Sequence, residues 1–185
     1  MSVSAPAPTQ RIYVARQPIL DTRNRVFGYE LLYRAQEGHT GCMAPSEVAT
    51  ARVLNDALLN LGLESIAQGR VAFFNISQDV LLDDTASLLP PQNIVIELLE
   101  TLEVTPKVIQ ACQSLQRRGY ALALDDFIPG SDAERLMPYV KYVKVDVLAL
   151  SEAEMVATAQ RLLPKGVTLL AEKVETAQVR DAARA

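Results

Sequence analysis

Polar side chains that could bind a metal or a phosphate recur at the ends of five apolar runs in this chain. The runs are VAFFN, NIVIE, ALALDD, YVKVD and VTLLAE. They bring to their ends Asn75, Glu97, Asp125, Asp126, Lys144, Asp146 and Glu172. Carboxylate and amide oxygens suit a hard divalent cation, and a lysine beside them suits an anionic substrate. The spacing therefore indicates metal-assisted chemistry on an anion such as a phosphoester.

Helix-like segments separate these runs, so strands and helices alternate along the chain. Such alternation predicts an α/β fold with a parallel sheet, and in a TIM-like (β/α) barrel the strand C-termini all meet at one face. We predict strands over 71–76, 93–98, 121–125, 141–146 and 167–172, preceded by strands in RIYVARQPILD and NRVFGYELLYR. A short connection containing Asn24 joins these first two strands, which could therefore pair as an antiparallel hairpin.

Capping residues mark the predicted helices. Thr105 followed by Pro106 is typical of a helix start, and Ser151 with Glu154 predicts a capping box. The predicted helices cover 46–62, 77–82, 105–119 and 151–163, with a short helix near 132 and a final helix from about 175. Glycines at the ends of three of them are typical helix stops.

The length allows one domain of moderate size. Seven strands are predicted in 185 residues, whereas a (β/α)₈ barrel takes about 250. We expect a disordered tail over 1–10 and one barrel domain over 11–185. The barrel is expected to be incomplete, lacking its last strand and helices, so that it is a fragment, stays open, or is completed by a partner. An exposed strand edge would favour pairing with a second copy.

Composition excludes several classes of function. The net charge of −4 argues against sequence-independent binding to DNA or RNA. No apolar run reaches the roughly 18 residues of a membrane span, and MSVSAPAPTQ lacks the apolar core of a signal peptide, so a cytoplasmic location is expected. Cys42 and Cys112 are expected to be free thiols. The single histidine, His39, is expected in a loop, which leaves histidine triads and His-rich zinc sites unsupported.

Each candidate acid also has a structural explanation. Glu30, within GYELLYR, faces either solvent or the barrel mouth. Asn75 could cap the next helix, and Glu97 with Glu100 could place negative charge near a helix N-terminus. The adjacent pair after ALAL is harder to explain structurally, because two buried carboxylates repel each other unless a cation relieves them.

Lys144 lies between two valines of a predicted core strand. Its amine needs a polar mouth or a counter-ion, and Asp146 is a candidate for that counter-ion. The lysine could orient or deprotonate an attacking water and offset charge on a phosphate. Because the ligands are nearly all oxygen, one or two Mg²⁺ or Mn²⁺ ions fit better than zinc. The sequence contains no Gly-rich phosphate loop.

These residues resemble those of the EAL domain, a barrel phosphodiesterase that hydrolyses cyclic di-GMP to linear pGpG. The match runs in order from about residue 12 to 176. It is carried by ARQPILD, GYELLYR, VAFFNIS, IELLE, LDDF, VKVD and AEKVET. Leu31 stands where the signature has alanine, and this ELL form resembles the subgroup in which an EAL domain precedes an HDOD domain. No HDOD sequence occurs among these 185 residues.

The resemblance implies a role for each site residue. Lys144 would contact the attacking water, Glu100 would steady the loop after DDF, and Glu172 would serve both catalysis and the metal. The implied metal ligands are Glu30, Asn75, Glu97, Asp125, Asp126 and Glu172, with Asp125 bridging two ions. The implied substrate contacts are Gln17, Leu32 and Arg34.

Three departures from the family pattern keep alternatives open. The loop after DDF reads IPGSDAERL instead of GTGYSSL, Lys173 replaces the usual glycine, and the later QG segment has no counterpart. In the family that loop helps to hold the metal site and couples it to dimerisation. The chain could be an active phosphodiesterase or a degenerate domain that binds cyclic di-GMP, a regulatory protein or a second copy. A barrel enzyme acting on another phosphoester is a third reading.

Overall fold

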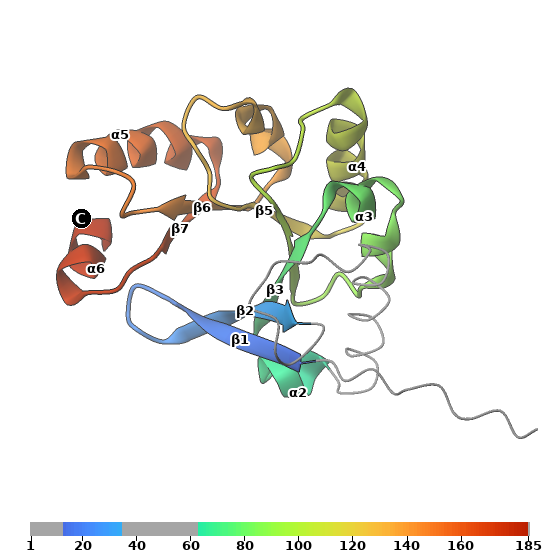
Figure 1. The fold of residues 1–185 in the computed structure, drawn as a ribbon, viewed down its shortest axis with the longest axis horizontal. Helices are drawn as coiled ribbons and strands as arrows, with labels where there is room; N and C mark the ends of the chain where they lie inside the picture. Colours follow the sequence, from blue (N-terminus) through green and yellow to red (C-terminus); the bar gives the residue numbers. More distant parts are fainter. Residues whose placement is uncertain (1–12, 35–62, 185) are drawn as a thin grey trace, which may run out of the picture.

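The protein is built on one curled sheet of seven strands, seen in a computed structural model that describes residues 13–34 and 63–184 (Figure 1). The strands are β1 (Tyr13–Leu20), β2 (Val26–Arg34), β3 (Val71–Ile76), β4 (Ile94–Leu98), β5 (Ala121–Leu124), β6 (Tyr142–Asp146) and β7 (Thr168–Glu172). They follow one another in the sheet in sequence order. The architecture is a half-barrel, which confirms the predicted α/β, TIM-like class.

The first two strands form the antiparallel hairpin, and every later pairing is parallel. Asp21 fixes the turn, because its Oδ1 accepts the backbone N–H groups of Arg23 and Arg25. Asn24 takes a positive φ of 60° there, a conformation that asparagine tolerates better than most residues. The hairpin alternative left open by the sequence is therefore correct.

Helices lie along the outer side of the sheet, as Figure 1 shows for α3, α4 and α5. The helices are α2 (Leu63–Ala67), α3 (Gln78–Leu82), α4 (Pro106–Arg117), α5 (Glu152–Leu162) and α6 (Ala177–Arg184), with 3-10 segments η1 (Thr85–Leu88), η2 (Asp132–Tyr139) and η3 (Leu163–Lys165). Ser77 and Thr105 cap α3 and α4, and Ser151 with Glu154 forms the predicted capping box of α5.

Two details differ from the sequence-based expectations. Helix α2 was not predicted, and it ends before Gln68 and Gly69, which both have positive φ. The segment near Asp132 is a 3-10 helix of eight residues with Pro138 inside it, and proline disrupts regular α-helical hydrogen bonding. The predicted tail, the helix over 46–62, His39 and Cys42 lie outside the described residues. Cys112 is a free, buried thiol.

Strand residues alternate between two cores. One set packs under the helices and includes Phe74, Ile96, Leu122 and Val143. The other lines the inside of the curl and includes Phe73, Val95, Ala123 and Tyr142, with the Phe73 and Tyr142 rings 5.3 Å apart. Because strand side chains repeat every two residues, the next inward positions are Asn75, Glu97, Asp125 and Lys144. An aromatic floor therefore supports the polar residues at the mouth.

The sheet stays open between its two outer strands. Among the described residues β1 pairs only with β2, and β7 pairs only with β6. Helix α6 lies beside the tip of the hairpin (Figure 1), where the Arg184 guanidinium donates to Asn24 Oδ1 at 2.7 Å. None of the helices over 13–34 and 63–184 is long and apolar enough to cross a bilayer.

Candidate active site

Four carboxylates from four strands or strand ends converge on the ammonium of Lys144. Their distances from Nζ are 2.7 Å for Asp125 Oδ1, 2.9 Å for Glu172 Oε1, 3.0 Å for Glu97 Oε1 and 3.3 Å for Glu30 Oε2. Asn75 joins the cluster through Nδ2, which donates to Glu30 Oε1 at 3.2 Å. Five of the six metal ligands implied by the resemblance, and the implied catalytic lysine, are thus brought together. We call these six residues the Lys144 cluster.

Burial makes the charges of this cluster strongly interdependent. Glu97 is fully buried, and the Lys144 side chain is only 4% exposed. Burial would lower the pKa of Lys144, but the surrounding carboxylates, Glu97 foremost, raise it above its ordinary value. Burial raises the pKa of Glu97 to about 8, against the opposing effect of the lysine, and it also raises the pKa of Glu172. One ammonium therefore does not neutralise four carboxylates, and Glu97 holds a proton more tightly than an exposed glutamate does.

Several oxygens of the Lys144 cluster lack a hydrogen-bond donor within the described part of the chain. They are Asn75 Oδ1, Glu97 Oε1, Glu97 Oε2 and Glu172 Oε2, all buried. Glu97 Oε1 does form an ion pair with Lys144, but its orientation is not that of a hydrogen bond. Buried acceptors normally have partners, and oxygen acceptors with excess negative charge fit a hard divalent cation.

The lysine stands at the centre of these acids. Over residues 13–34 and 63–184, no three carboxylates lie in the geometry of direct ligands to one ion. The ammonium provides the positive charge that draws them together instead. The carboxylate and amide oxygens of this cluster are thus of the type that binds Mg²⁺ or Mn²⁺, while Lys144 determines how they are arranged here.

A second ion-pair group lies beside the first and is centred on Lys173. Its Nζ contacts Asp146 Oδ2 at 2.5 Å and Asp126 Oδ1 at 3.5 Å. The expectation that Asp146 is the counter-ion of Lys144 is therefore wrong. Asp146 lies at the end of β6, where the loop after β7 brings Lys173 within reach, and this hydrogen bond lowers the pKa of Asp146. Asp126 likewise faces Lys173 rather than the Lys144 cluster.

A pocket of about 980 Å³ opens over the site between the hairpin and the β7–α6 segment. Its lining includes Gln17 from β1, Glu30, Lys144 and Glu172 from the cluster, and Arg180 from α6. Gln17, one of the substrate contacts that the resemblance implies, is among the residues that line this pocket. Leu32 is half-exposed on β2 and does not line the pocket. Arg34 is the last residue of β2, and the structure describes its backbone but not its side chain.

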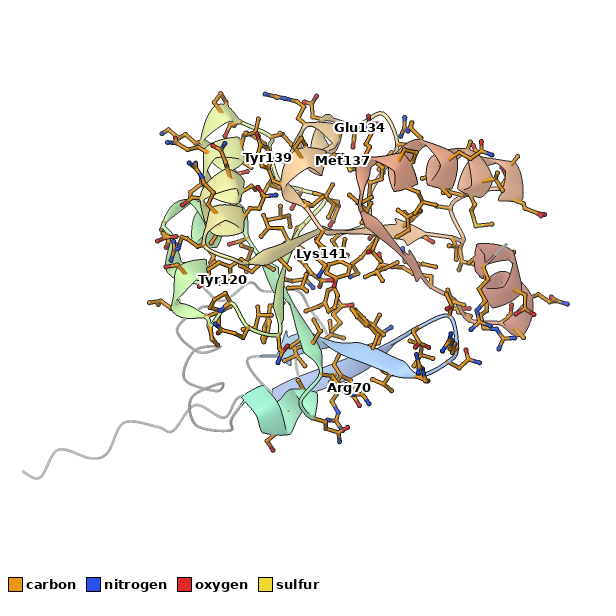
Figure 2. All side chains as sticks on the ribbon, turned by 180° about the vertical axis from the view of Figure 1, so that it is seen from behind. Arg70, Tyr120, Glu134, Met137, Tyr139 and Lys141 are labelled. Atoms are coloured by element: carbon orange, nitrogen blue, oxygen red, sulfur yellow. The ribbon has the colours of Figure 1, made fainter. Side chains whose placement is uncertain are left out.

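Glu100 is not part of the cluster. It is exposed in the turn after β4 and makes no hydrogen bond or ion pair with the described residues. The loop that it was expected to steady is held by Glu134 instead. Glu134 Oε1 accepts the Gly130 backbone N–H at 2.7 Å and pairs with Arg161 of α5 at 2.9 Å. In Figure 2, Glu134, a residue of η2, lies at the top of the view beside α5.

A curled, mostly parallel sheet with acids, an amide and a buried lysine at its strand C-termini defines the class of (β/α)-barrel proteins that carry their chemistry at the mouth. Residues 7–185 match the family model described as the EAL domain, and the chain belongs to this family. The fold and family expected from the sequence are confirmed.

Two curated relatives are similar over nearly all of the chain. The uncharacterized protein YuxH of Bacillus subtilis is 36% identical over 171 residues, covering 90% of this chain and 42% of YuxH. The cyclic di-GMP phosphodiesterase CdgJ of Vibrio cholerae is 39% identical over 168 residues, covering 89% of this chain and 39% of CdgJ. The chain is thus homologous to a cyclic di-GMP phosphodiesterase. It spans about two fifths of the length of these relatives.

Solved EAL structures share the fold. The Bacillus subtilis YkuI protein, in complex with substrate c-di-GMP and calcium, has a TM-score of 0.71 at 19% identity, covering 94% of this chain and 52% of YkuI. The EAL domain of Mycobacterium smegmatis DcpA has a TM-score of 0.70 at 21% identity, covering 91% of this chain and 84% of that domain. These likenesses establish the half-barrel architecture.

Sequence reasoning missed two residues that organise the site. Glu134 holds the loop after β5, and its position four residues after Gly130 was the available signal. Lys173 was noted as a replacement of glycine but received no role. The missing clue was that its backbone has a positive φ of 58°, which glycine adopts without strain.

Proposed function

We propose that this chain binds cyclic di-GMP over the Lys144 cluster and hydrolyses one of its two phosphodiester bonds to give linear pGpG, with Mg²⁺ or Mn²⁺ as cofactor. The observation that carries the proposal is the convergence of four carboxylates and an amide on one buried lysine at the barrel mouth. A merely structural site does not need such an excess of buried acids, because uncompensated carboxylates destabilise a fold.

The cluster divides the chemistry among its side chains. We assign metal binding to Glu30, Asn75, Glu97, Asp125 and Glu172. The sixth ligand that the resemblance implies, Asp126, faces Lys173 instead. A bound divalent cation would lower the pKa of a coordinated water and offset negative charge on the phosphodiester. The unpartnered oxygens of Asn75, Glu97 and Glu172 are the acceptors best suited to this role.

Lys144 supplies fixed positive charge in the hydrolysis that we propose. Its ammonium is held between Asp125 and Glu172, so it cannot turn away to solvent as a surface lysine does. A buried cation of this kind stabilises charge that develops on a phosphate oxygen and can hydrogen-bond the attacking water. Its raised pKa favours the ammonium form, so it acts as a donor rather than as a general base.

The pocket supplies the binding surface for substrate. Gln17 and Arg180 offer donors to phosphate or base edges on opposite sides of the opening, while Leu32 and Arg34 remain proposed contacts on β2. A volume near 980 Å³ is within the usual range for a small-molecule site. The name of CdgJ and the substrate complex of YkuI support cyclic di-GMP as this ligand.

Binding without turnover is the second candidate. The altered loop, held by Glu134, and the engagement of Asp126 by Lys173 both favour it, because a ligand set without its usual support loses rate. In that case the domain would act as a cytoplasmic sensor of cyclic di-GMP. Its response would pass to a homodimer partner, a regulatory protein, or an HDOD domain in a longer protein.

The test is turnover of cyclic di-GMP with Mg²⁺ or Mn²⁺, following linear pGpG, on protein first shown to be folded. Product that disappears with EDTA and with Glu30→Ala would support the hydrolase. Saturable cyclic di-GMP binding without product would support the sensor. Neither binding nor product from the folded chain would contradict both, and other cyclic dinucleotides and phosphodiesters would then be assayed.

A further inference from the structure

The acids at the barrel mouth are divided between two lysines. The two groups differ in whether their oxygen atoms have hydrogen-bond or ion-pair partners. The Lys144 cluster is buried and leaves oxygens of Asn75, Glu97 and Glu172 without donors. Around Lys173, by contrast, Asp126 and Asp146 each have an ammonium partner. Among the described residues of these two groups, buried oxygens without a hydrogen-bond partner therefore occur only in the Lys144 cluster.

Lys173 reaches its two partners from a constrained backbone. It directly follows Glu172, the last residue of β7, with a φ of 58°, and Asp126 opposite it has a φ of 40°. Both residues are in the left-handed region, where a side chain costs energy that glycine avoids. The contacts to Asp146 and Asp126 help to offset this cost.

We propose that Lys173 is a built-in cation that takes Asp126 out of the metal-binding set, so that this site holds one divalent ion rather than two. The inference rests on the proposed metal-dependent function. A second divalent ion at Asp126 would have to displace the ammonium and would be repelled by it. The first ion also faces an ammonium, that of Lys144. The Lys144 cluster nevertheless keeps buried oxygens of Asn75, Glu97 and Glu172 that have no hydrogen-bond donor among the described residues, so acceptors remain there for one ion.

The substitution that defines the family difference also tests the idea. We would titrate Mn²⁺ into the metal-free protein and count bound ions by electron paramagnetic resonance and calorimetry, at low and constant ionic strength. Wild type should bind one ion. Lys173→Met removes the charge and keeps the side-chain length, and Lys173→Gly also relieves the backbone. Both should gain a second ion whose affinity is at least about 5-fold tighter than any second binding in wild type, the low end for coupled sites.

Two further variants separate charge from other effects. Lys173→Arg keeps the cation and should retain one ion. Lys107→Met is the matched control, because Lys107 is exposed in the first turn of α4, outside the Lys144 cluster and the Lys173 group, and the net-charge change is the same. It too should bind one ion.

The outcomes distinguish failure of the one-ion inference from failure of the proposed metal-dependent function. Two ions in wild type, or one ion in Lys173→Met, would overturn the inference while leaving the metal site intact. A second ion in Lys173→Gly but not in Lys173→Met would assign the effect to the backbone and would also overturn it. Absence of Mn²⁺ binding in every folded variant would overturn the proposed metal-dependent function together with the inference.

Discussion

Lys144 Nζ lies 3.0 Å from Glu97 Oε1, and neither side chain is more than 4% exposed. Lys144 lies on β6 and Glu97 on β4, and both side chains point to the inside of the curled sheet. Strand β5 separates these two strands. The pair thus joins three strands at the mouth of the half-barrel. Because both groups are desolvated, loss of the lysine leaves Glu97 buried without a cation. Loss of Glu97 leaves the lysine with three carboxylate partners, namely Asp125, Glu172 and Glu30.

Replacing Lys144 with methionine should destabilise the fold. The change leaves four carboxylates facing one another without a cation, and breaking a buried ion pair by removing one partner typically costs about 3–5 kcal/mol. Urea unfolding in EDTA measures the loss. Excess Mn²⁺ should restore more stability to the variant than to wild type. Lys141→Met, on an exposed lysine near the start of the same strand, is the control and should change stability little.

Asp125→Asn tests the metal site with the least change in shape. Asp125 makes the shortest of the four contacts to Lys144, and an amide in its place lacks the negative charge that strengthens binding of a divalent cation. We expect Mn²⁺ affinity to fall by more than about 100-fold, because even outer partners of a metal site cost 10–100-fold. Calorimetry gives the affinity. Asp83→Asn, on an exposed acid after α3, should bind as wild type; equal losses in both variants would contradict the assignment.

The pH dependence of stability should reveal the proton on Glu97. Its pKa is raised from 4.5 to about 8 by burial, so its contribution to stability is complete below 4.5 and is lost as pH rises toward 8. In EDTA, the free energy of unfolding of wild type should fall relative to Glu97→Gln over that window. The slope is at most about 1.4 kcal/mol per pH unit, the value for one proton. Parallel curves would show that Glu97 ionises normally.

Glu134→Gln should loosen the loop after β5. The substitution weakens the contacts to Gly130 and Arg161 without removing side-chain volume. Hydrogen bonds to charged groups contribute about 1.5–3 kcal/mol, so amide exchange at Gly130 should accelerate by roughly 10-fold or more. Exchange followed by NMR gives the rate. Glu152→Gln, on an exposed acid at the start of α5, should leave it unchanged.

Replacing Ile128 and Pro129 with glycine and threonine restores the family sequence at the start of that loop. Ile128 is 67% exposed and makes little packing contribution, so the folded state should tolerate the change. If the altered loop limits hydrolysis, turnover to pGpG should rise. A soluble, folded double variant without any gain would show that another feature, such as Lys173, limits the rate.

Most of the fold could be predicted because its signals are local. Thr105 with Pro106 and Ser151 with Glu154 each fix a helix start through neighbouring backbone groups, and the structure confirms both. Asn75, Glu97 and Asp125 end predicted parallel strands, and the meeting of strand C-termini at one face of a barrel placed them at one mouth. Helix α2 carries no comparable cap in the sequence and was missed.

Ion-pair partners were harder to predict than positions. Asp146, two residues after Lys144, is a candidate counter-ion for that lysine on sequence grounds, yet its partner is Lys173, 27 residues later. Which lysine reaches which acid depends on the left-handed backbone at Lys173 and on desolvation at Lys144, and neither is visible in residue order. The grouping of acids therefore required the structure.

The sequential order of the strands has a consequence for how the chain folds. From β3 onward each parallel strand pairs with the one made just before it, and β1 with β2 needs only a short turn. Such a topology lets the sheet grow in the direction of synthesis, although the crossover before each parallel pairing makes its formation slower than that of local helical contacts. Lys144 arrives only with β6, after Glu30, Asn75, Glu97 and Asp125, so the growing chain carries uncompensated acids until that strand docks. Pulsed hydrogen exchange should show protection in β1–β4 preceding that in β6; simultaneous protection would contradict this order.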